Sequence, residues 1–154
     1  MSEPRLRYGQ LAPIGMAKMR ELEHYLNTGT GLEPVLLELV RLRASLMNGC
    51  EACTALHTAE LKKRNETEER IANVAEWRGF DGYTQRERAA LAWSEALTEI
   101  QQGHAPDELY EEVREHFDVV ETANLTIAIA SINAWNRITI ALGTRPQQVE
   151  VARL

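Results

Sequence analysis

Apolar positions recur at spacings of three and four residues along most of this chain, which is the periodicity of helices that turn one face toward a core. The same stretches lack the alternation of apolar and polar positions that is typical of strands. The pattern predicts seven helices, at residues 14–26, 32–47, 52–61, 71–77, 88–100, 109–117 and 120–142. Short runs rich in glycine, asparagine or proline separate them. We therefore expect a compact all-α fold of about six to eight helices.

Capping residues mark several of the expected helix starts. Thr67 and Asp107 each stand shortly before a predicted helix, where a side-chain oxygen can accept a hydrogen bond from a free backbone N–H. Thr84 followed by Glu87 is a capping-box pattern. No internal repeat or low-complexity linker divides the chain, so we expect residues 1–154 to form a single domain.

The last predicted helix, at residues 120–142, is apolar on most of its faces and carries few charges. Such a helix must be covered nearly all round, and a domain of this size rarely encloses one helix completely. The remaining surface, together with part of residues 32–47, is therefore expected to pack against a second subunit. Symmetric self-association is the common solution, so we expect a homo-oligomer.

Charge and hydropathy exclude several classes of function. The formal charge of −6 comes from scattered residues of both signs, without the basic stripe that binds nucleic acid. No glycine-rich dinucleotide or phosphate signature is present. The first residues lack the apolar segment of a secretory signal, and no unbroken apolar run approaches membrane-span length. We expect a cytoplasmic protein with no membrane or nucleic-acid partner.

The chemistry of the chain is concentrated around its two cysteines, Cys50 and Cys53, which His57 follows after four residues. A bond between two cysteines so close in sequence closes a very small loop and adds little stability, so a structural disulfide is not expected. In a reducing compartment such a pair is more often redox-active or metal-binding. A thiolate here can attack a hydroperoxide to give a sulfenic acid, which the second thiol converts to a disulfide.

Helix geometry places these three side chains together. At 100° per residue, positions 50, 53 and 57 fall within a sector of about 60° on one helix face. Asn48 and Gly49 form a natural helix terminator, so the cysteines are expected to open a new helix, where the positive end of its dipole favours thiolates. This argument favours Cys50, nearer the helix start, as the more reactive thiol.

Glu38 is a candidate partner only if the chain folds back at the predicted break. It lies twelve residues before Cys50, roughly 18 Å away along an uninterrupted helix. After a fold-back, its carboxylate can accept a proton from the thiols or from His57. In an apolar setting we expect its pKa to rise. The alternative is a solvated carboxylate paired with Arg41, three residues on.

Glu38, Cys50, Cys53 and His57, in the arrangement Ex11CxxCxxxH, resemble the active-site signature of AhpD-like alkylhydroperoxidases within the carboxymuconolactone decarboxylase superfamily. The resemblance covers most of the chain, and the chain is most similar in kind to the small single-domain members of that family. It extends over the segments LELVRLRASLMNGCEACTALHTAELKKRNETEERI, ERAALAWSEALTEI and INAWNRITIAL.

The resemblance implies an all-α oligomer, often a trimer or hexamer, that reduces hydroperoxides without a metal, flavin or other cofactor. It also implies that Cys53 meets the peroxide and that Cys50 is the resolving thiol, which is the reverse of the dipole argument. An external dithiol, such as a lipoyl protein, is the implied reductant. The chain is shorter than the better known relatives and has Ala52 where some carry histidine, which weakens transfer of a specific partner.

The leading hypothesis is a thiol-dependent peroxidase that uses the cysteine pair with a Glu38/His57 proton relay. One alternative is a dithiol adaptor that exchanges disulfides between proteins with little peroxidase activity. Another is a decarboxylase of the carboxymuconolactone type, although that chemistry needs no dithiol. Finally, the same four side chains contain enough donors for a zinc site, but the second ligand pair that usual zinc motifs draw from elsewhere is missing.

Overall fold

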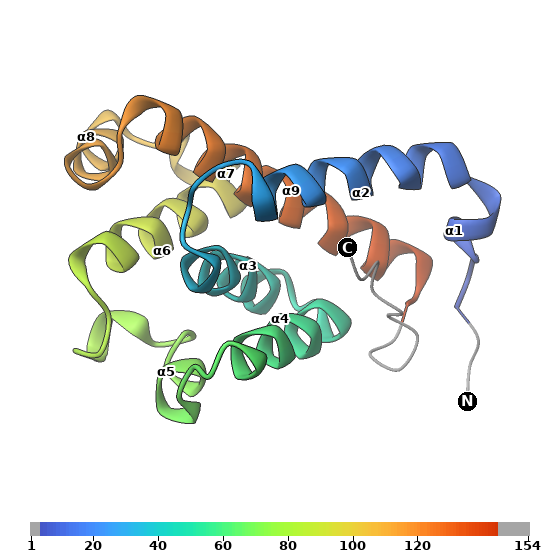
Figure 1. Ribbon diagram of the computed structural model, residues 1–154, viewed down its shortest axis with the longest axis horizontal. Coiled ribbons are helices and arrows are strands. Elements are labelled where there is room, and N and C mark those ends of the chain that lie inside the picture. Colours follow the sequence, from blue (N-terminus) through green and yellow to red (C-terminus); the bar gives the residue numbers. More distant parts are fainter. Residues whose placement is uncertain (1–3, 145–154) are drawn as a thin grey trace.

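The computed structural model describes residues 4–144, and this part of the chain is entirely helical apart from turns and loops (Figure 1). The elements in order are α1 (Tyr8–Leu11), α2 (Pro13–Thr28), α3 (Pro34–Asn48), α4 (Glu51–Lys63), α5 (Glu68–Ala72), the 3-10 turn η1 (Trp77–Gly79), α6 (Gln85–Thr98), α7 (Ile100–Gly103), α8 (Asp107–His116) and α9 (Val119–Leu142). The all-α prediction is confirmed.

The predicted helices correspond to α2, α3, α4, α5, α6, α8 and α9, with two divisions that the periodicity did not show. The helix expected at residues 88–100 ends at Thr98, and Ile100 begins the separate helix α7. The helix expected at residues 71–77 ends at Ala72, and Trp77 begins the separate turn η1. The helices α1 and α7 have only four residues each, too few to display a period in the sequence.

Two of the predicted caps are confirmed and one is wrong. Thr67 accepts from the backbone N–H of Arg70, and Thr84 forms the expected capping box with Glu87. Asp107 is not a cap, because α8 begins at Asp107 itself after Pro106 and no side-chain cap bond forms. Its carboxylate instead lies in the first turn, where negative charge is stabilised by the helix dipole.

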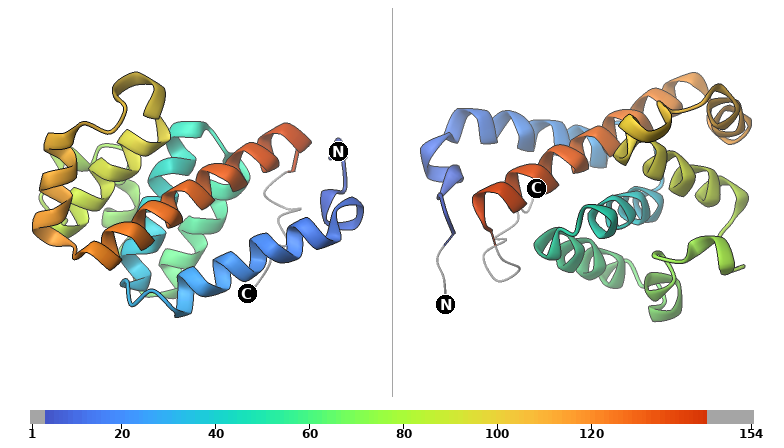
Figure 2. Two further views of the ribbon diagram at one scale, coloured as in Figure 1. Left: turned by 90° about the horizontal axis from the view of Figure 1, so that it is seen from above. Right: turned by 180° about the vertical axis from the view of Figure 1, so that it is seen from behind.

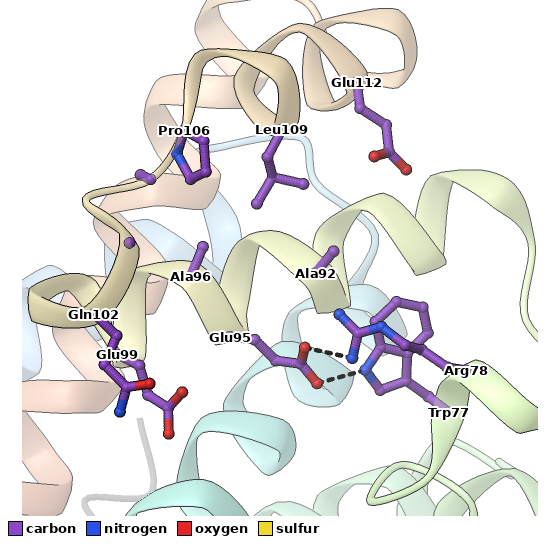
Figure 3. A pocket seen from close by; sticks show the side chains of 12 residues that line it. Trp77, Arg78, Ala92, Glu95, Ala96, Glu99, Gln102, Pro106, Leu109 and Glu112 are labelled. Carbon is purple, nitrogen blue, oxygen red and sulfur yellow. Dashed lines mark hydrogen bonds and ion pairs between the residues drawn. The ribbon is translucent and has the colours of Figure 1, made fainter.

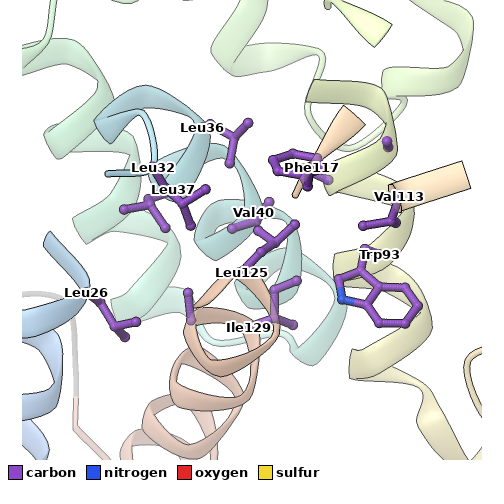
Figure 4. Close-up of a cluster of buried hydrophobic side chains, with 13 residues drawn as sticks. Leu26, Leu32, Leu36, Leu37, Val40, Trp93, Val113, Phe117, Leu125 and Ile129 are labelled. Carbon is purple, nitrogen blue, oxygen red and sulfur yellow. The ribbon is translucent and has the colours of Figure 1, made fainter. Parts of the chain in front are cut away.

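Helix α3 is the centre of the fold, with α4, α6 and α9 packed around it (Figures 1 and 2). One face contributes to a cluster with α6 and α9, which Phe117 closes from the end of α8 (Figure 4). The opposite face contributes Leu39 and Leu42 to a second cluster with α4, α5 and α6. Because α3 is covered on both sides, polar groups along it are held within the interior and away from bulk water.

The break between α3 and α4 is the feature that forms the site. Gly49 adopts the left-handed conformation, with φ of 66°, which glycine tolerates without steric cost. The N–H of Gly49 donates to the carbonyl of Leu46, and the N–H of Cys50 donates to that of Ser45, the paired bonds of a Schellman motif. The helix therefore breaks here, as the sequence predicted, and α4 returns alongside α3, which is the fold-back that Glu38 needs in order to approach the cysteines.

Amide side chains fix this reversal to α9. Asn48 donates through its Nδ2 to the Oδ1 atoms of Asn133 and Asn136, at 2.9 Å each. Asn136 donates in turn to the hydroxyl of Ser45 at 3.1 Å. Ser45 and Asn48 thus hold the end of α3 in place through these contacts with α9.

Helix α9 has the length and mean hydropathy of a membrane span, the only such helix between residues 4 and 144. The sequence shows no unbroken apolar run of that length, because polar residues interrupt the helix. Within its most apolar window, 44% of the residues are buried inside the protein. Val119, Val120, Ile127 and Ile140 remain exposed on α9. Its polar side chains pack on α3 and α6, so the structure uses α9 as a core helix with one uncovered side.

Candidate functional site

The chain reversal places both cysteines in the first turn of α4. Cys50 is the N-cap residue, Cys53 lies three residues on, and the two form a disulfide with their Cα atoms 5.3 Å apart. The backbone N–H of Cys53 donates to Sγ of Cys50 at 3.3 Å. Cys50 is 1% exposed and Cys53 5% exposed. The sulfur of Cys50 therefore receives a hydrogen bond at the positive end of a helix, while Cys53 is nearer the surface.

His57 and Glu38 meet as a buried pair beside the cysteines. Nδ1 of His57 lies 2.7 Å from Oε2 of Glu38, and both side chains are shielded from solvent. His57 follows Cys53 by four residues, so the two share one face of α4. With Nδ1 held by the carboxylate, Nε2 is the ring nitrogen left for proton transfer. The structure thus brings together all four residues that the sequence selected.

The pKa of Glu38 is lowered to about 2, so the predicted rise is wrong. Burial does favour the protonated acid, as expected, and is the largest single influence. The hydrogen bond and charge of His57, together with the charge and hydrogen bond of Arg41, outweigh it. Glu38 is therefore a carboxylate at neutral pH and acts as an acceptor that orients His57.

Arg41 connects Glu38 to a second carboxylate. Its Nη1 donates to Oε1 of Glu38 at 2.7 Å and to Oδ1 of Asn27 at 2.8 Å. Its Nη2 donates to Oε2 of Glu23 at 2.9 Å. The other oxygen of Glu23 accepts from the indole of Trp135 at 3.1 Å and from the hydroxyl of Ser131. A continuous chain of polar contacts thus runs from His57 across α3 to α2 and α9.

The sequence revealed only part of this network. Arg41 was visible three residues after Glu38, but as a surface pair and an alternative to function. In the structure Arg41 is buried, and Glu38 contacts both Arg41 and His57. Glu23 was missed, because nothing in its spacing along α2 distinguishes it from the exposed Glu21 on the same helix. Only the packing of α2 against α3 and α9 gives it partners.

Acid should therefore weaken the protein partly through Glu38. A carboxyl group whose folded pKa is about 2, against a usual 4.5, contributes stability that is present above pH 4.5 and lost as the pH falls through 2. We expect Glu38→Gln to be less stable than wild type at pH 7, with the difference shrinking toward pH 2.5. Denaturant unfolding at several pH values measures this difference. A gap that stays constant with pH would show that Glu38 is not charged in the native protein.

A surface hollow of about 440 Å³ lies elsewhere, between η1, α6 and the α7–α8 segment (Figure 3). None of the four candidate residues lines it. Glu95, on its wall, accepts from Trp77 and Arg43 at 2.8 Å each and also pairs with Arg78. In the part of the chain that the structure describes, no group of three or more His, Cys, Asp and Glu side chains is arranged to hold a metal ion.

Comparison with known proteins agrees with this geometry. The sequence profile of the carboxymuconolactone decarboxylase family matches residues 13–96, a segment that includes the cysteine pair, Glu38 and His57. The chain belongs to the carboxymuconolactone decarboxylase family. The uncharacterized protein YdfG of Bacillus subtilis is 42% identical over 141 residues, which cover 92% of this chain and 95% of YdfG.

Solved structures place the chain among the AhpD-like members of the family. A protein of unknown function from Agrobacterium tumefaciens, provisionally named antioxidant defence protein AhpD, is 36% identical with a TM-score of 0.89. The match covers 93% of this chain and 97% of that one. A peroxidase-related protein with an alkylhydroperoxidase AhpD core from Ralstonia eutropha shares the fold at 20% identity and a TM-score of 0.79, over 93% and 76% of the two chains.

Proposed function

We propose that this protein is a thiol-dependent peroxidase that reduces organic hydroperoxides or hydrogen peroxide through Cys50 and Cys53. The observation that carries the proposal is the buried His57–Glu38 pair, one helical turn from a cysteine pair already joined as a disulfide. A structural disulfide needs no proton-transfer group beside it, whereas cysteine cycling does. Membership of the family and the likeness to AhpD-like structures support the same role.

In the proposed cycle Cys53 attacks first, because it lies four residues before His57 on one face of α4 and is the less completely buried of two buried cysteines. His57 accepts the thiol proton through Nε2. The resulting thiolate attacks the terminal oxygen of the hydroperoxide and breaks the O–O bond. The cysteine becomes a sulfenic acid, and the leaving alkoxide takes up the proton as an alcohol, or as water from hydrogen peroxide.

Resolution and regeneration then use Cys50. Its thiol attacks the sulfenic sulfur, and water leaves as the disulfide forms. An external dithiol must supply the two electrons that reopen the bond, and in the proposed cycle its thiolate attacks the sulfur of Cys53, the less completely buried cysteine. Cys50 leaves as a thiolate. Its sulfur accepts a hydrogen bond from the backbone N–H of Cys53, which makes it a good leaving group. A lipoyl group is a dithiol of the required kind.

The second candidate is a dithiol adaptor that only exchanges disulfides between proteins. The stabilised leaving group at Cys50 favours it as much as it favours a peroxidase. Wild-type protein with cumene hydroperoxide and excess dihydrolipoamide separates the two. We expect peroxide consumption over many cycles. A disulfide that dihydrolipoamide reduces readily, with no peroxide consumed, would instead establish the adaptor.

We also propose that the protein is a cytoplasmic homo-oligomer, with a trimer or hexamer implied by the family resemblance. Exposed apolar side chains lie along α9, as noted above, and Leu11, Ile14 and Tyr25 are exposed on α1 and α2. Helices α2 and α9 lie side by side, so one apolar surface can serve both (Figure 2). Light scattering of the purified protein measures the assembly, and a monomer at micromolar concentration would contradict it.

A further inference from the structure

The polar chain that ends at His57 begins far from the cysteines, at Glu23 on α2. Glu23 has all its partners fixed, since one oxygen accepts from Arg41 and the other from Ser131 and Trp135. Its side chain is 15% exposed, whereas that of Arg41 is 3% exposed. A carboxylate this well satisfied holds the guanidinium in one place, because both ends of the pair are anchored on different helices.

Arg41 stands between two carboxylates that compete for it. It directs Nη1 to Glu38 and Nη2 to Glu23, so its single positive charge is divided. This division matters for His57, because Glu38 must present its second oxygen, Oε2, to the ring. If the Glu23 charge were absent, the whole attraction of Arg41 would fall on Glu38. The carboxylate would then orient His57 less effectively.

We infer that Glu23, acting through Arg41, is a positioning residue for the reaction: it keeps Glu38 oriented toward His57 and sets the charge of the relay. This inference rests on the proposed cysteine chemistry. Glu23 has its hydrogen bonds with Arg41, Ser131 and Trp135 and not with the cysteines, so its effect passes through the Arg41–Glu23 and Arg41–Glu38 ion pairs. Nothing in the spacing of the motif residues indicates a participant on α2.

The charged groups around the relay define the expected direction of a pH effect. Helix α2 contributes Glu23, and α3 contributes Glu38 and Arg41. Helix α4 contributes the two thiols, His57 and Glu60. The charge of Glu60 is paired with Lys63 and Arg64, and the negative charge of Glu38 acts to raise the pKa of Glu60. Helix α9 contributes only neutral donors to Glu23, those of Ser131 and Trp135. Removing the Glu23 charge makes this cluster more positive, so each proton on it is lost at a lower pH.

The fold contains a matched control for Glu23. Glu95 also accepts from an arginine of α3, Arg43, and from a tryptophan indole, that of Trp77. Its side chain is likewise 15% exposed. Glu95, however, has no contact with Glu38 or His57. Glu23→Gln and Glu95→Gln therefore each change a carboxylate that accepts from an arginine of α3 and from an indole, although Glu95 also pairs with Arg78. Only the first reaches the relay.

The test is the rate at which iodoacetamide alkylates the reduced protein, measured across pH, together with hydroperoxide turnover. We expect Glu23→Gln to lower hydroperoxide turnover about tenfold at neutral pH, in line with the loss of a group that orients a reacting side chain. The acid limb of the alkylation profile should move to lower pH. Glu95→Gln should match wild type in both, and Glu23→Asp, which keeps the charge, should leave the limb in place.

Profiles of Glu23→Gln and Glu95→Gln that coincide with each other would overturn the inference, because Glu23 would then be only structural. The inference would also be overturned if Glu23→Asp moved the acid limb of the alkylation profile as far as Glu23→Gln does. If Glu23→Gln does not fold, Trp135→Phe and Trp77→Phe repeat the comparison, and only the first should slow hydroperoxide turnover. Should wild type consume no peroxide, the proposed function fails, while the alkylation profiles still decide the role of Glu23.

Discussion

Cys53→Ser is expected to abolish hydroperoxide turnover, by more than about a thousandfold, because it removes the thiol that attacks peroxide in the proposed cycle and leaves no pair to form the disulfide. Cys50→Ser should also stop continuous turnover, since the disulfide cannot form. It should nevertheless consume one equivalent of peroxide per chain and stop as a sulfenic acid. Dimedone, which reacts with sulfenic acids, should therefore label Cys50→Ser after one addition of cumene hydroperoxide and leave Cys53→Ser unlabelled. Mass spectrometry of the intact chain reads both results.

The converse labelling would assign the first attack to Cys50. That outcome would mean that the backbone N–H and the helix dipole at the N-cap decide reactivity, and that exposure and the position of His57 do not. Labelling of neither variant, with both folded, would contradict the peroxidase mechanism itself. Circular dichroism of the two variants provides the folding control.

Arg41→Ala is expected to lower the free energy of unfolding by about 3 to 5 kcal/mol at pH 7, the cost of leaving buried charges without their partner. Glu38 and Glu23 would then face each other across the site with no cation between them. Arg43→Ala is the matched control, because Arg43 lies on the same helix and pairs with one glutamate. Its side chain is 18% exposed and Glu95 keeps two other donors, so we expect a loss of about 1 kcal/mol.

Denaturant unfolding measures both variants. Equal losses would show that Arg41 contributes no more than a surface ion pair. A third variant makes the interpretation specific: Glu23→Gln, Glu38→Gln and Arg41→Met combined should recover much of the stability lost in Arg41→Ala, since no buried charge remains unpaired. It should still lack activity, because His57 has lost its carboxylate.

Local features of the sequence predicted most of the fold. Helix periodicity predicted the long helices, Asn48 and Gly49 predicted the break after α3, and Thr84 with Glu87 predicted the start of α6. Each of these signals acts within a few residues. The errors occurred where local rules admit two outcomes. Asp107 suits both the cap and the first turn of a helix, and Pro106 decides between them through the backbone. The division near Ala72 depends on how Trp77 packs into the second cluster.

The candidate site was predictable in its members but not in its electrostatics. The spacing of Glu38, Cys50, Cys53 and His57, with one helix break, suffices to bring them together. The low pKa of Glu38 depends on Arg41 being buried beside it, and the place of Glu23 depends on α2 crossing α3. Both arise from tertiary packing, which spacing along the chain does not report. The extent of the domain over residues 1–154 and the roles of the four residues stay predictions.

The position of the two sulfurs within one helical turn has a consequence for the rate of the proposed cycle. Helix α4 is intact from Glu51 onward with the disulfide closed, so the disulfide fits within the first turn without breaking the helix. Peroxidases whose two cysteines lie on distant segments must rearrange the chain before the second sulfur can reach the first. In the proposed cycle the sulfurs would exchange bonds within one turn of α4, so we expect the rate of turnover to follow the concentrations of peroxide and dithiol.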